Sequence, residues 1–328
     1  MRAILWLTTA AAVLYGGYWA VGSRAVLQGA EAALTQMKAD GLAGYDALTL
    51  TGFPSRFDLR LEAPALRSPD GRIGWQAAFL QIFALSYKPH HIIAVWPPEQ
   101  TLSVGPENVT ITTRDMRASA VFGLDADLPL DHAQMIVDAP QAASDAGWGA
   151  RAGELRLAIR QGDSAAGAQD IGAEALDLAF DGHLADRLAA AGGLAPAVER
   201  MWLDAALTFD GPIDRLTPER GLRLIGAEVR AIEVDWGTAA LRATGSLTVD
   251  DAGQPEGRLT FRVTDWRAVL SAAKATGLVE PDIAATAEKM LAQLSQLSGD
   301  ASAVELPLIF SRGWMSLGPL PLGPAPRF

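Results

Sequence analysis

The stretch Phe57-Asp58-Leu59-Arg60-Leu61-Glu62 alternates apolar and charged side chains at every step. Successive side chains of a β-strand point to opposite faces, so the alternation predicts a strand with one apolar and one hydrated face. The same pattern returns at residues 155–160, 203–210 and 232–236. Strands of a parallel sheet are covered on both faces and read as continuous apolar runs, so these alternating segments indicate an antiparallel sheet.

Two other segments predict strand pairs. Leu241–Val249 and Leu259–Val263 flank Asp250-Asp251-Ala252-Gly253, whose residues favour a tight turn, so we expect a β-hairpin there. The apolar run Phe79–Trp96 is interrupted near its middle, which predicts two buried strands around a turn at Pro89. Pro97-Pro98 should end the second strand, because proline has no N–H to donate to a neighbouring strand.

The amino end predicts a membrane-spanning helix. No charged side chain lies between Arg2 and Arg24, and at ~1.5 Å per residue this stretch can cross a hydrocarbon core of ~30 Å. Two interpretations are open: a signal peptide cleaved after the small residues of Ala20-Val21-Gly22, or a retained anchor. The aromatic cluster of residues 15–19 favours the anchor, because such rings settle at the headgroup level.

The charge at the amino end predicts the orientation of the chain. Arg2 and the free amine should stay in the cytoplasm, which places everything after Ser23 across the membrane. The chain has 23 arginines against four lysines, a bias typical of GC-rich bacterial genomes. We therefore expect an inner-membrane protein that crosses once, through residues 3–22, with most of its chain in the periplasm.

The pattern divides the chain into three parts. Residues 1–23 are the anchor, 24–41 an amphipathic helix ended by Gly41, and 42–328 a β-rich domain. The amphipathic helix serves as a stalk or a lid, and its apolar positions are Val26, Ala30, Ala33, Leu34 and Met37. Trp148-Gly149 and Trp236-Gly237 each precede a predicted strand, which leaves open two similar sheets that meet near residues 185–200.

Helical signals mark two more segments. Pro196 suits the first turn of a helix after the break at Gly192-Gly193. Beyond Pro281 the apolar residues form one helical stripe, and Gly299 stands where a C-cap is expected. The stripe consists of Ile283, Ala287, Met290, Leu291, Leu294 and Leu297. It could pack on the sheet or lie on a membrane surface; we favour packing, because the polar face offers Lys289 as its single cation.

Composition excludes several kinds of chemistry. The 38 acidic and 27 basic residues give a net charge of −11, which disfavours a nucleic-acid partner. The absence of cysteine excludes thiolate nucleophiles and iron–sulfur clusters.

Ser271 and Lys274 match an S-x-x-K motif whose companion motifs are missing. His90 and His91 would point to opposite faces of a strand, so we interpret them as turn residues. We expect no enzyme activity, catalytic residue, metal or cofactor.

Four stretches carry a resemblance to a known family. They are GFPSRF at 52–57, FLQIFALSYKPHHIIAVWP at 79–97, DWG at 235–237 with GSLTVDDAGQPEGRL at 245–259, and LGPLPLGPAPR at 317–327. Together they resemble the alphaproteobacterial family of domain of unknown function 2125, over about residues 45–328. The resemblance implies a membrane-anchored envelope protein of unassigned activity. The passage around Gln254-Pro255-Glu256-Gly257 is also similar to AsmA-like envelope proteins, which are associated with outer-membrane assembly and lipid transport.

These patterns predict a mostly β, α+β protein. We expect a large, curved antiparallel sheet, or sheets, with a few packed helices and one N-terminal transmembrane helix. The expected function is to bind or pass an apolar ligand such as a lipid along a groove of the sheet. The candidate ligand-binding residues are Phe53, Phe57, Leu59, Leu61 and Phe261. The alternative is a structural or scaffolding role with another envelope protein as partner and no ligand.

Overall fold

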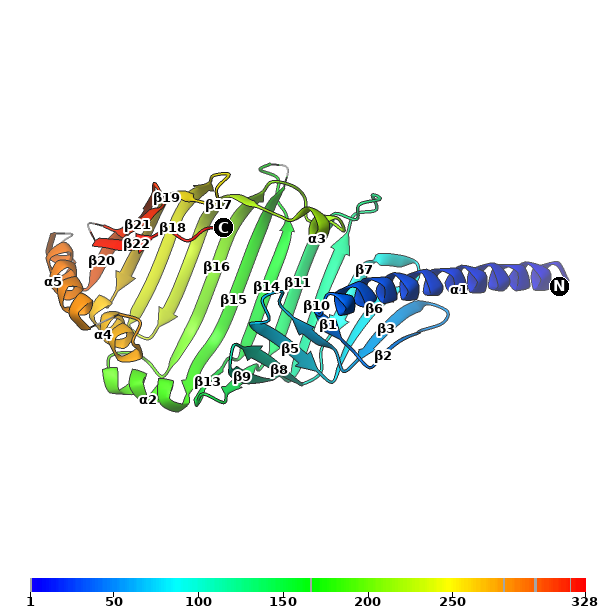
Figure 1. Ribbon diagram of the computed structural model, residues 1–328, viewed down its shortest axis with the longest axis horizontal. Helices are drawn as coiled ribbons and strands as arrows, with labels where there is room; N and C mark the ends of the chain where they lie inside the picture. The colour runs from blue at the N-terminus through cyan, green and yellow to red at the C-terminus, as the bar shows by residue number, and fades with distance from the viewer. Residues whose placement is uncertain (1, 166, 280, 298–299, 319) are drawn as a thin grey trace.

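The computed structural model describes residues 2–165, 167–279, 281–297, 300–318 and 320–328. A long helix, α1 (Arg2–Ala39), projects from a β-sheet whose 22 described strands pair antiparallel (Figure 1). The prediction of a mostly β, α+β fold with one N-terminal apolar helix is confirmed. By length and composition α1 is long and apolar enough to cross a membrane, since an 18-residue window within it has a mean hydropathy of 1.4.

Helix α1 ends as its sequence predicts. Gly41 adopts a positive φ of 73°, the Gly41 N–H donates to the Lys38 carbonyl, and the Leu42 N–H donates to the Met37 carbonyl at 2.8 Å. These two bonds satisfy carbonyl groups that have no partner inside the helix. The helix runs without a break from Arg2 to Ala39. The anchor and the amphipathic segment, which we predicted as separate parts, are thus one continuous helix.

One set of strands forms what we call the main layer. From β2 to β22, each strand of this layer pairs with the next. In order of pairing, the strands are β2 (Ala47–Thr51), β3 (Arg56–Glu62), β6 (Phe79–Leu85), β7 (Lys88–Val95), β10 (Asp115–Phe122), β11 (Leu130–Asp138), β14 (Glu154–Gln161), β15 (Ala168–Asp181), β16 (Ala197–Phe209), β17 (Leu224–Trp236), β18 (Ala239–Val249), β19 (Pro255–Thr264), β20 (Ala303–Ser311), β21 (Trp314–Leu317) and β22 (Leu320–Pro324).

Shorter strands fold over the N-terminal half of the main layer and form the second layer. These are β1 (Ala43–Gly44), β4 (Ala65–Arg67), β5 (Ile73–Ala77), β8 (Glu99–Val104), β9 (Glu107–Thr112), β12 (Gln141–Ser144) and β13 (Trp148–Arg151). The second layer joins the main layer at β15, which pairs with β14 through residues 169–176 and with β13 through residues 179–181. The two layers are thus parts of one folded sheet.

The chain passes between the layers at a row of corners. Ala63 and Ala139 adopt positive φ angles of 46°, and each precedes a proline. Hydrogen bonds continue across the row: the Ala63 N–H donates to the Ala78 carbonyl and the Ala139 N–H to the Gly153 carbonyl, both at 2.9 Å. Because backbone groups stay paired at the bend, the sheet folds without leaving polar groups unsatisfied there.

The C-terminal half of the main layer is covered at its end by helices. They are α2 (Gly182–Ala191), α4 (Trp266–Thr276) and α5 (Pro281–Leu297). Leu291 of α5 and Trp266 of α4 form a buried cluster with Val304 and Leu306 of β20, and Met290 and Leu294 pack against it. The prediction that the stripe packs on the sheet is confirmed for Met290, Leu291 and Leu294, and the side chains of Ile283 and Leu297 lie outside the described ones. The proposed C-cap Gly299 lies outside the described residues.

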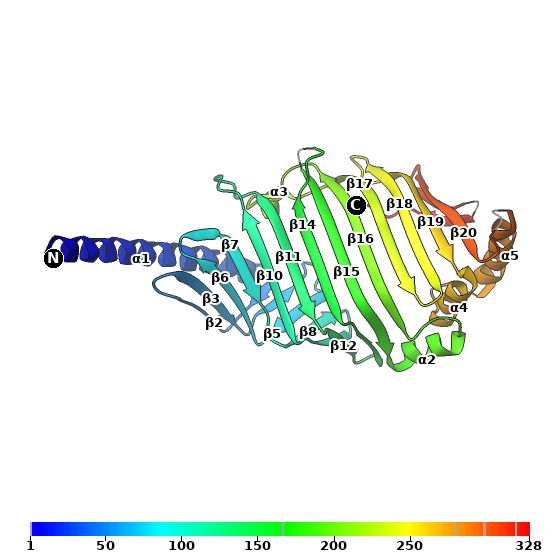
Figure 2. The same cartoon turned by 180° about the vertical axis from the view of Figure 1, so that it is seen from behind.

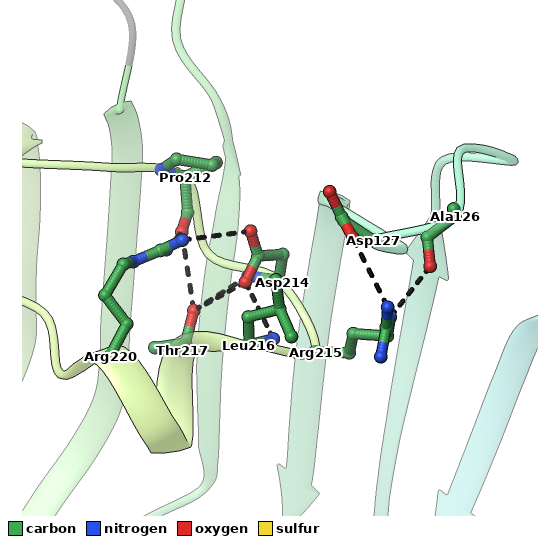
Figure 3. A network of polar contacts seen from close by, with 8 residues as sticks. All are labelled: Ala126, Asp127, Pro212, Asp214, Arg215, Leu216, Thr217 and Arg220. Atoms are coloured by element: carbon green, nitrogen blue, oxygen red, sulfur yellow. Dashed lines mark hydrogen bonds and ion pairs between the residues drawn. The ribbon is translucent and has the colours of Figure 1, made fainter.

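The connection between β16 and β17 runs back along one edge of the sheet. It contains α3 (Thr217–Arg220) and reaches the turn between β10 and β11 (Figure 3). There the Arg215 Nε donates to the Ala126 carbonyl at 2.8 Å, and the Leu130 N–H donates to the Ile213 carbonyl at 2.7 Å. This connection ties the two halves of the main layer together.

The predictions for the hairpin within residues 79–96 need two corrections. The turn predicted at Pro89 lies at Ser86-Tyr87. Pro89 belongs to β7, and it pairs with no residue of the neighbouring strand β10. The missing proline N–H therefore costs no hydrogen bond to that strand. Both strands of this hairpin are half-buried, not buried, apart from the exposed β7 residues Lys88, Pro89 and Ile93.

Pro196 does not begin a helix. Gly192 and Gly193, with φ of 66° and 83°, follow the end of α2, and Pro196 directly precedes β16. The segment 185–200, considered as the meeting point of two sheets, connects β15 to β16, which pair directly within one sheet. The hairpin predicted around Asp250–Gly253 is confirmed, with Leu241 opposite Val263.

Candidate functional site

An apolar row crosses the main layer from β2 to β20, with one residue from each strand. Directly paired residues of antiparallel strands lie on the same face of a sheet, so this row lies on one face. Its members are Leu50, Leu59, Ile82, Ala94, Ala118, Met135, Leu157, Ala173, Leu203, Ile232, Ala243, Phe261 and Leu306.

Parallel rows on the same face are also free of charged and polar side chains. On one side lie Phe57, Ala84, Ile92, Ala120, Ala133, Ile159, Ile171, Ala205, Val229, Gly245, Leu259 and Leu308. On the other side lie Met116, Val137, Leu155, Ala175, Met201, Val234, Leu241, Val263 and Val304. We call these three rows the apolar strip.

The opposite face of the main layer is charged, and Figure 2 views it with strands β10–β18 in front. Arg230 binds Asp170 and Asp204, each at 2.8 Å, and Arg160 binds Asp170 at 3.1 Å. These residues line a concave basin of about 660 Å³ together with Trp202. The hydrogen bond from Arg230 holds the pKa of Asp170 below its ordinary value. Each of these charged side chains therefore already has an ion-pair partner within the basin.

The two ends of the apolar strip are covered and its centre is partly open. The second layer lies over the N-terminal end, where Gln100 of β8 donates a hydrogen bond to the sulfur of Met116 in β10. Helices α4 and α5 cover the opposite end through Trp266 and Leu291. Between these covers, Leu157 of β14 remains 50% exposed and Met201 of β16 remains 38% exposed.

A cavity of about 250 Å³ lies where α1, the main layer and the second layer meet. All of its lining residues are apolar or aromatic: Ala30, Ala33, Leu34, Met37, Leu48, Leu59, Leu61, Pro64, Leu66, Trp75, Leu80 and Ile82. The indole N–H of Trp75 donates to Gln100 at 2.9 Å and so leaves no unpaired polar atom facing the cavity. Four of the five apolar positions predicted for the amphipathic helix line this space, which supports its interpretation as a lid.

The predicted ligand-binding residues fall into two groups. Leu59 and Leu61 line the cavity under α1. Phe57 is 4% exposed and stacks on Trp19 of α1 with ring centroids 6.2 Å apart, while Phe53 is 64% exposed beside the same indole. Phe261 lies on β19, near the other end of the apolar strip. The first four are therefore neighbours, and Phe261 is separated from them along the strip.

Sequence reasoning missed the partly open centre of the strip. The alternation around Leu155–Ile159 and Leu203–Phe209 marks apolar faces, but alternation alone does not show which face is uncovered. Leu157 and Met201 become distinctive only through the positions of the second layer and the helices. No sequence signal separates them from the buried Val137 or Ala205 on the same face.

Other candidate groups have structural partners. The Ser271 hydroxyl donates to the Ala191 carbonyl at 3.1 Å, which links α4 to α2. His91 lies in β7, not in the turn, and its Nε2 bonds the Ser119 hydroxyl at 2.9 Å. Within the described residues, no group of three or more His, Asp and Glu side chains is arranged to hold a metal ion.

Comparison with known sequences identifies the family of the chain. No curated protein matches it. A bacterial sequence family matches residues 19–326, which include α1 from Trp19 onward, both layers and the covering helices. The match covers nearly the whole chain and confirms the resemblance drawn from the four sequence stretches. The chain belongs to the family described as uncharacterized protein conserved in bacteria (DUF2125).

Proposed function

We propose that this protein is anchored once in the bacterial inner membrane and that its periplasmic β-domain binds a lipid along the apolar strip without catalysing a reaction. The observation that carries the proposal is the unbroken sequence of apolar cross-strand pairs from β2 to β20. A chain of contacts this long offers an acyl chain the same environment at every strand. The proposed ligand therefore needs a long apolar part and no particular headgroup.

The exposure of the strip centre supports a bound apolar ligand. Leu157 and Met201 expose 50% and 38% of their surface, and transferring apolar area from water contributes about 25 cal/mol per Å². Monomeric proteins rarely leave large contiguous apolar patches in water, and such patches commonly mark binding sites. A ligand lying between the second layer and the covering helices would bury this surface.

The position of α1 supports movement of the ligand away from the membrane. Helix α1 extends along the direction in which the main-layer strands are stacked (Figure 1). Leu59 and Leu61 lie at the end of the strip beside α1, and Phe261 lies toward the far end. An acyl chain entering under α1 would therefore pass from strand to strand toward β19.

A photoreactive fatty acid added to the full-length chain in lipid nanodiscs tests this proposal. We expect mass spectrometry to map cross-links to peptides from the apolar strip. Leu157→Asp should reduce these cross-links strongly. Ala158→Asp is the matched control, since residue 158 is exposed on the opposite, charged face of the same strand.

Each outcome separates lipid binding from a scaffolding role. Equal cross-linking of both folded variants would contradict binding at the strip. Folded wild-type protein that takes up no photoreactive lipid would favour scaffolding, in which another envelope protein covers the open centre.

A further inference from the structure

Two turns of the β-domain lie beside α1 and point toward its N-terminal end (Figure 1). One joins β2 to β3 and carries Phe53, and the other joins β6 to β7 and carries Tyr87. Both side chains are largely in solvent, 64% and 62% exposed. We propose that these turns, which we call the tip, enter the leaflet of the membrane that α1 spans. The inference rests on the proposed membrane-spanning role of α1.

The length of α1 that precedes its docked part carries the argument. Tyr15 is docked on the β-domain by a hydrogen bond to Ser86, and residues 2–14 of α1, which precede it, span about 20 Å at 1.5 Å per residue. A hydrocarbon core of about 30 Å is therefore roughly 10 Å longer than this segment. The uncharged stretch between Arg2 and Arg24 is long enough, but its second part is docked on the β-domain.

Three aromatic side chains hold this docked part in place. The Tyr15 hydroxyl bonds the Ser86 hydroxyl at 2.9 Å, and the Tyr18 hydroxyl donates to the Ser86 carbonyl at 2.6 Å. The Trp19 indole N–H donates to the Arg56 carbonyl at 2.8 Å. If residues 15–22 complete the membrane span while these bonds persist, the tip has to enter the leaflet with them.

The tip is chemically suited to an apolar surrounding. Backbone polar groups facing hydrocarbon need internal partners, and the carbonyls of Ser86 and Arg56 accept bonds from α1. The buried Ser86 hydroxyl lies 3.3 Å from the Pro54 carbonyl, and the Ser86 N–H donates to the Ser55 carbonyl at 2.9 Å. Lys88, exposed directly after Tyr87, can extend its ammonium group toward lipid phosphates.

Insertion of the tip would bring the lipid-binding end of the domain to the leaflet itself. Phe53 contacts Trp19 at a ring-centroid distance of 5.2 Å, and Trp19 in turn stacks on Phe57 at the start of β3. The same strand continues to Leu59 and Leu61 in the apolar cavity. A lipid tail would then reach the cavity without crossing water.

The chain contains no cysteine, so single-cysteine variants of the full-length protein can be labelled at one site each. Phe53→Cys and Tyr87→Cys place an NBD fluorophore on the tip. Leu7→Cys, 73% exposed in α1, reports insertion of the helix, and Leu278→Cys, 83% exposed after α4, reports water. Each variant is reconstituted into phosphatidylcholine and phosphatidylglycerol vesicles containing spin-labelled lipids as quenchers.

The expected result is blue-shifted, strongly quenched emission at positions 7, 53 and 87, and water-like, weakly quenched emission at position 278. Quenching at 7 with water-like emission at 53 and 87 would overturn the membrane-inserted tip and leave the anchor intact. Water-like emission at position 7 as well would overturn both the anchor and the tip.

Discussion

Gly22 of α1 lies directly against the ring of Phe57 in β3: a Cβ atom at residue 22 would stand 3.0 Å from the Phe57 Cζ. This contact would be tighter than nine in ten that real Cβ atoms make, so glycine permits the helix to approach the strand. Together with the stacking of Trp19 on Phe57, it fixes how α1 covers the start of the apolar strip.

Gly22→Leu should therefore weaken the packing of α1 on the β-domain. Overpacking of a filled contact typically costs about 1–3 kcal/mol, and we expect a lower unfolding temperature for the detergent-solubilised full chain. Gly29→Leu is the matched control, because a Cβ at residue 29 meets no atom within 4 Å. Equal unfolding temperatures for the two variants would show that the Gly22–Phe57 contact does not constrain the helix.

Leu291→Ala should destabilise the C-terminal end of the sheet. Leu291 is 9% exposed in the cluster with Trp266 and Val304, so its truncation removes buried area and leaves a cavity, at a cost of about 2–5 kcal/mol. Leu278→Ala, at an 83% exposed position, should change little. Unchanged thermal unfolding of Leu291→Ala, accompanied by weaker binding to liposomes, would instead favour a membrane-surface role for α5.

Asp170 should contribute stability that depends on pH. Its pKa is lowered in the folded protein by the hydrogen bond from Arg230, so this contribution is present above its ordinary value of 3.8 and is lost as pH falls through the lower folded pKa. Asp170→Asn should be less stable than the wild type at pH 7, and the difference should shrink below about pH 4. Denaturant unfolding at pH 7 and pH 3 measures this.

Asp163→Asn, in the exposed turn between β14 and β15, controls for the loss of one negative charge. It should differ little from the wild type at both pH values. A deficit of Asp170→Asn that is equally large at pH 3 would mean that the substitution acts through packing and not through the ion pair.

A reporter fused through a linker after Phe328 should be active only when it is exported. Phe328 is 57% exposed, so the fusion leaves the sheet intact. We expect activity from alkaline phosphatase, which needs an oxidising compartment, and none from a reporter confined to the cytoplasm. The reverse would contradict the proposed orientation. A mature chain beginning at Ser23 would contradict the retained anchor alone.

The sequence predicts the faces of the strands well, because alternation is a local property. Leu155, Leu157 and Ile159 lie on one face, as do Leu203 and Ala205. Whether a face is covered depends on distant segments. Leu59 and Leu157 lie in the same apolar row, yet Leu59 lines the cavity beneath α1 and Leu157 remains half exposed.

The corners are the least predictable part of the fold. Alanine has no preference for positive φ, so Ala63 and Ala139 give no sign that the chain bends there. The proline that follows each of them indicates a break in a strand, as does Pro97 between β7 of the main layer and β8 of the second layer, but a break alone does not show that the chain changes layer. The fold becomes evident only when all the corners are seen to lie side by side, where one sheet bends into two layers.

The order of pairing in the main layer also sets the length of the apolar strip. Neighbouring strands lie about 4.8 Å apart, so the thirteen strands from β2 to β20 extend the apolar row over roughly 58 Å. From β15 onward each strand pairs with the one that follows it in the chain, so another hairpin could be inserted without rearranging the others. If α1 spans the membrane as proposed, the number of hairpins sets how far the strip extends from the bilayer. Duplication or deletion of a few dozen residues could then change this distance by one hairpin at a time.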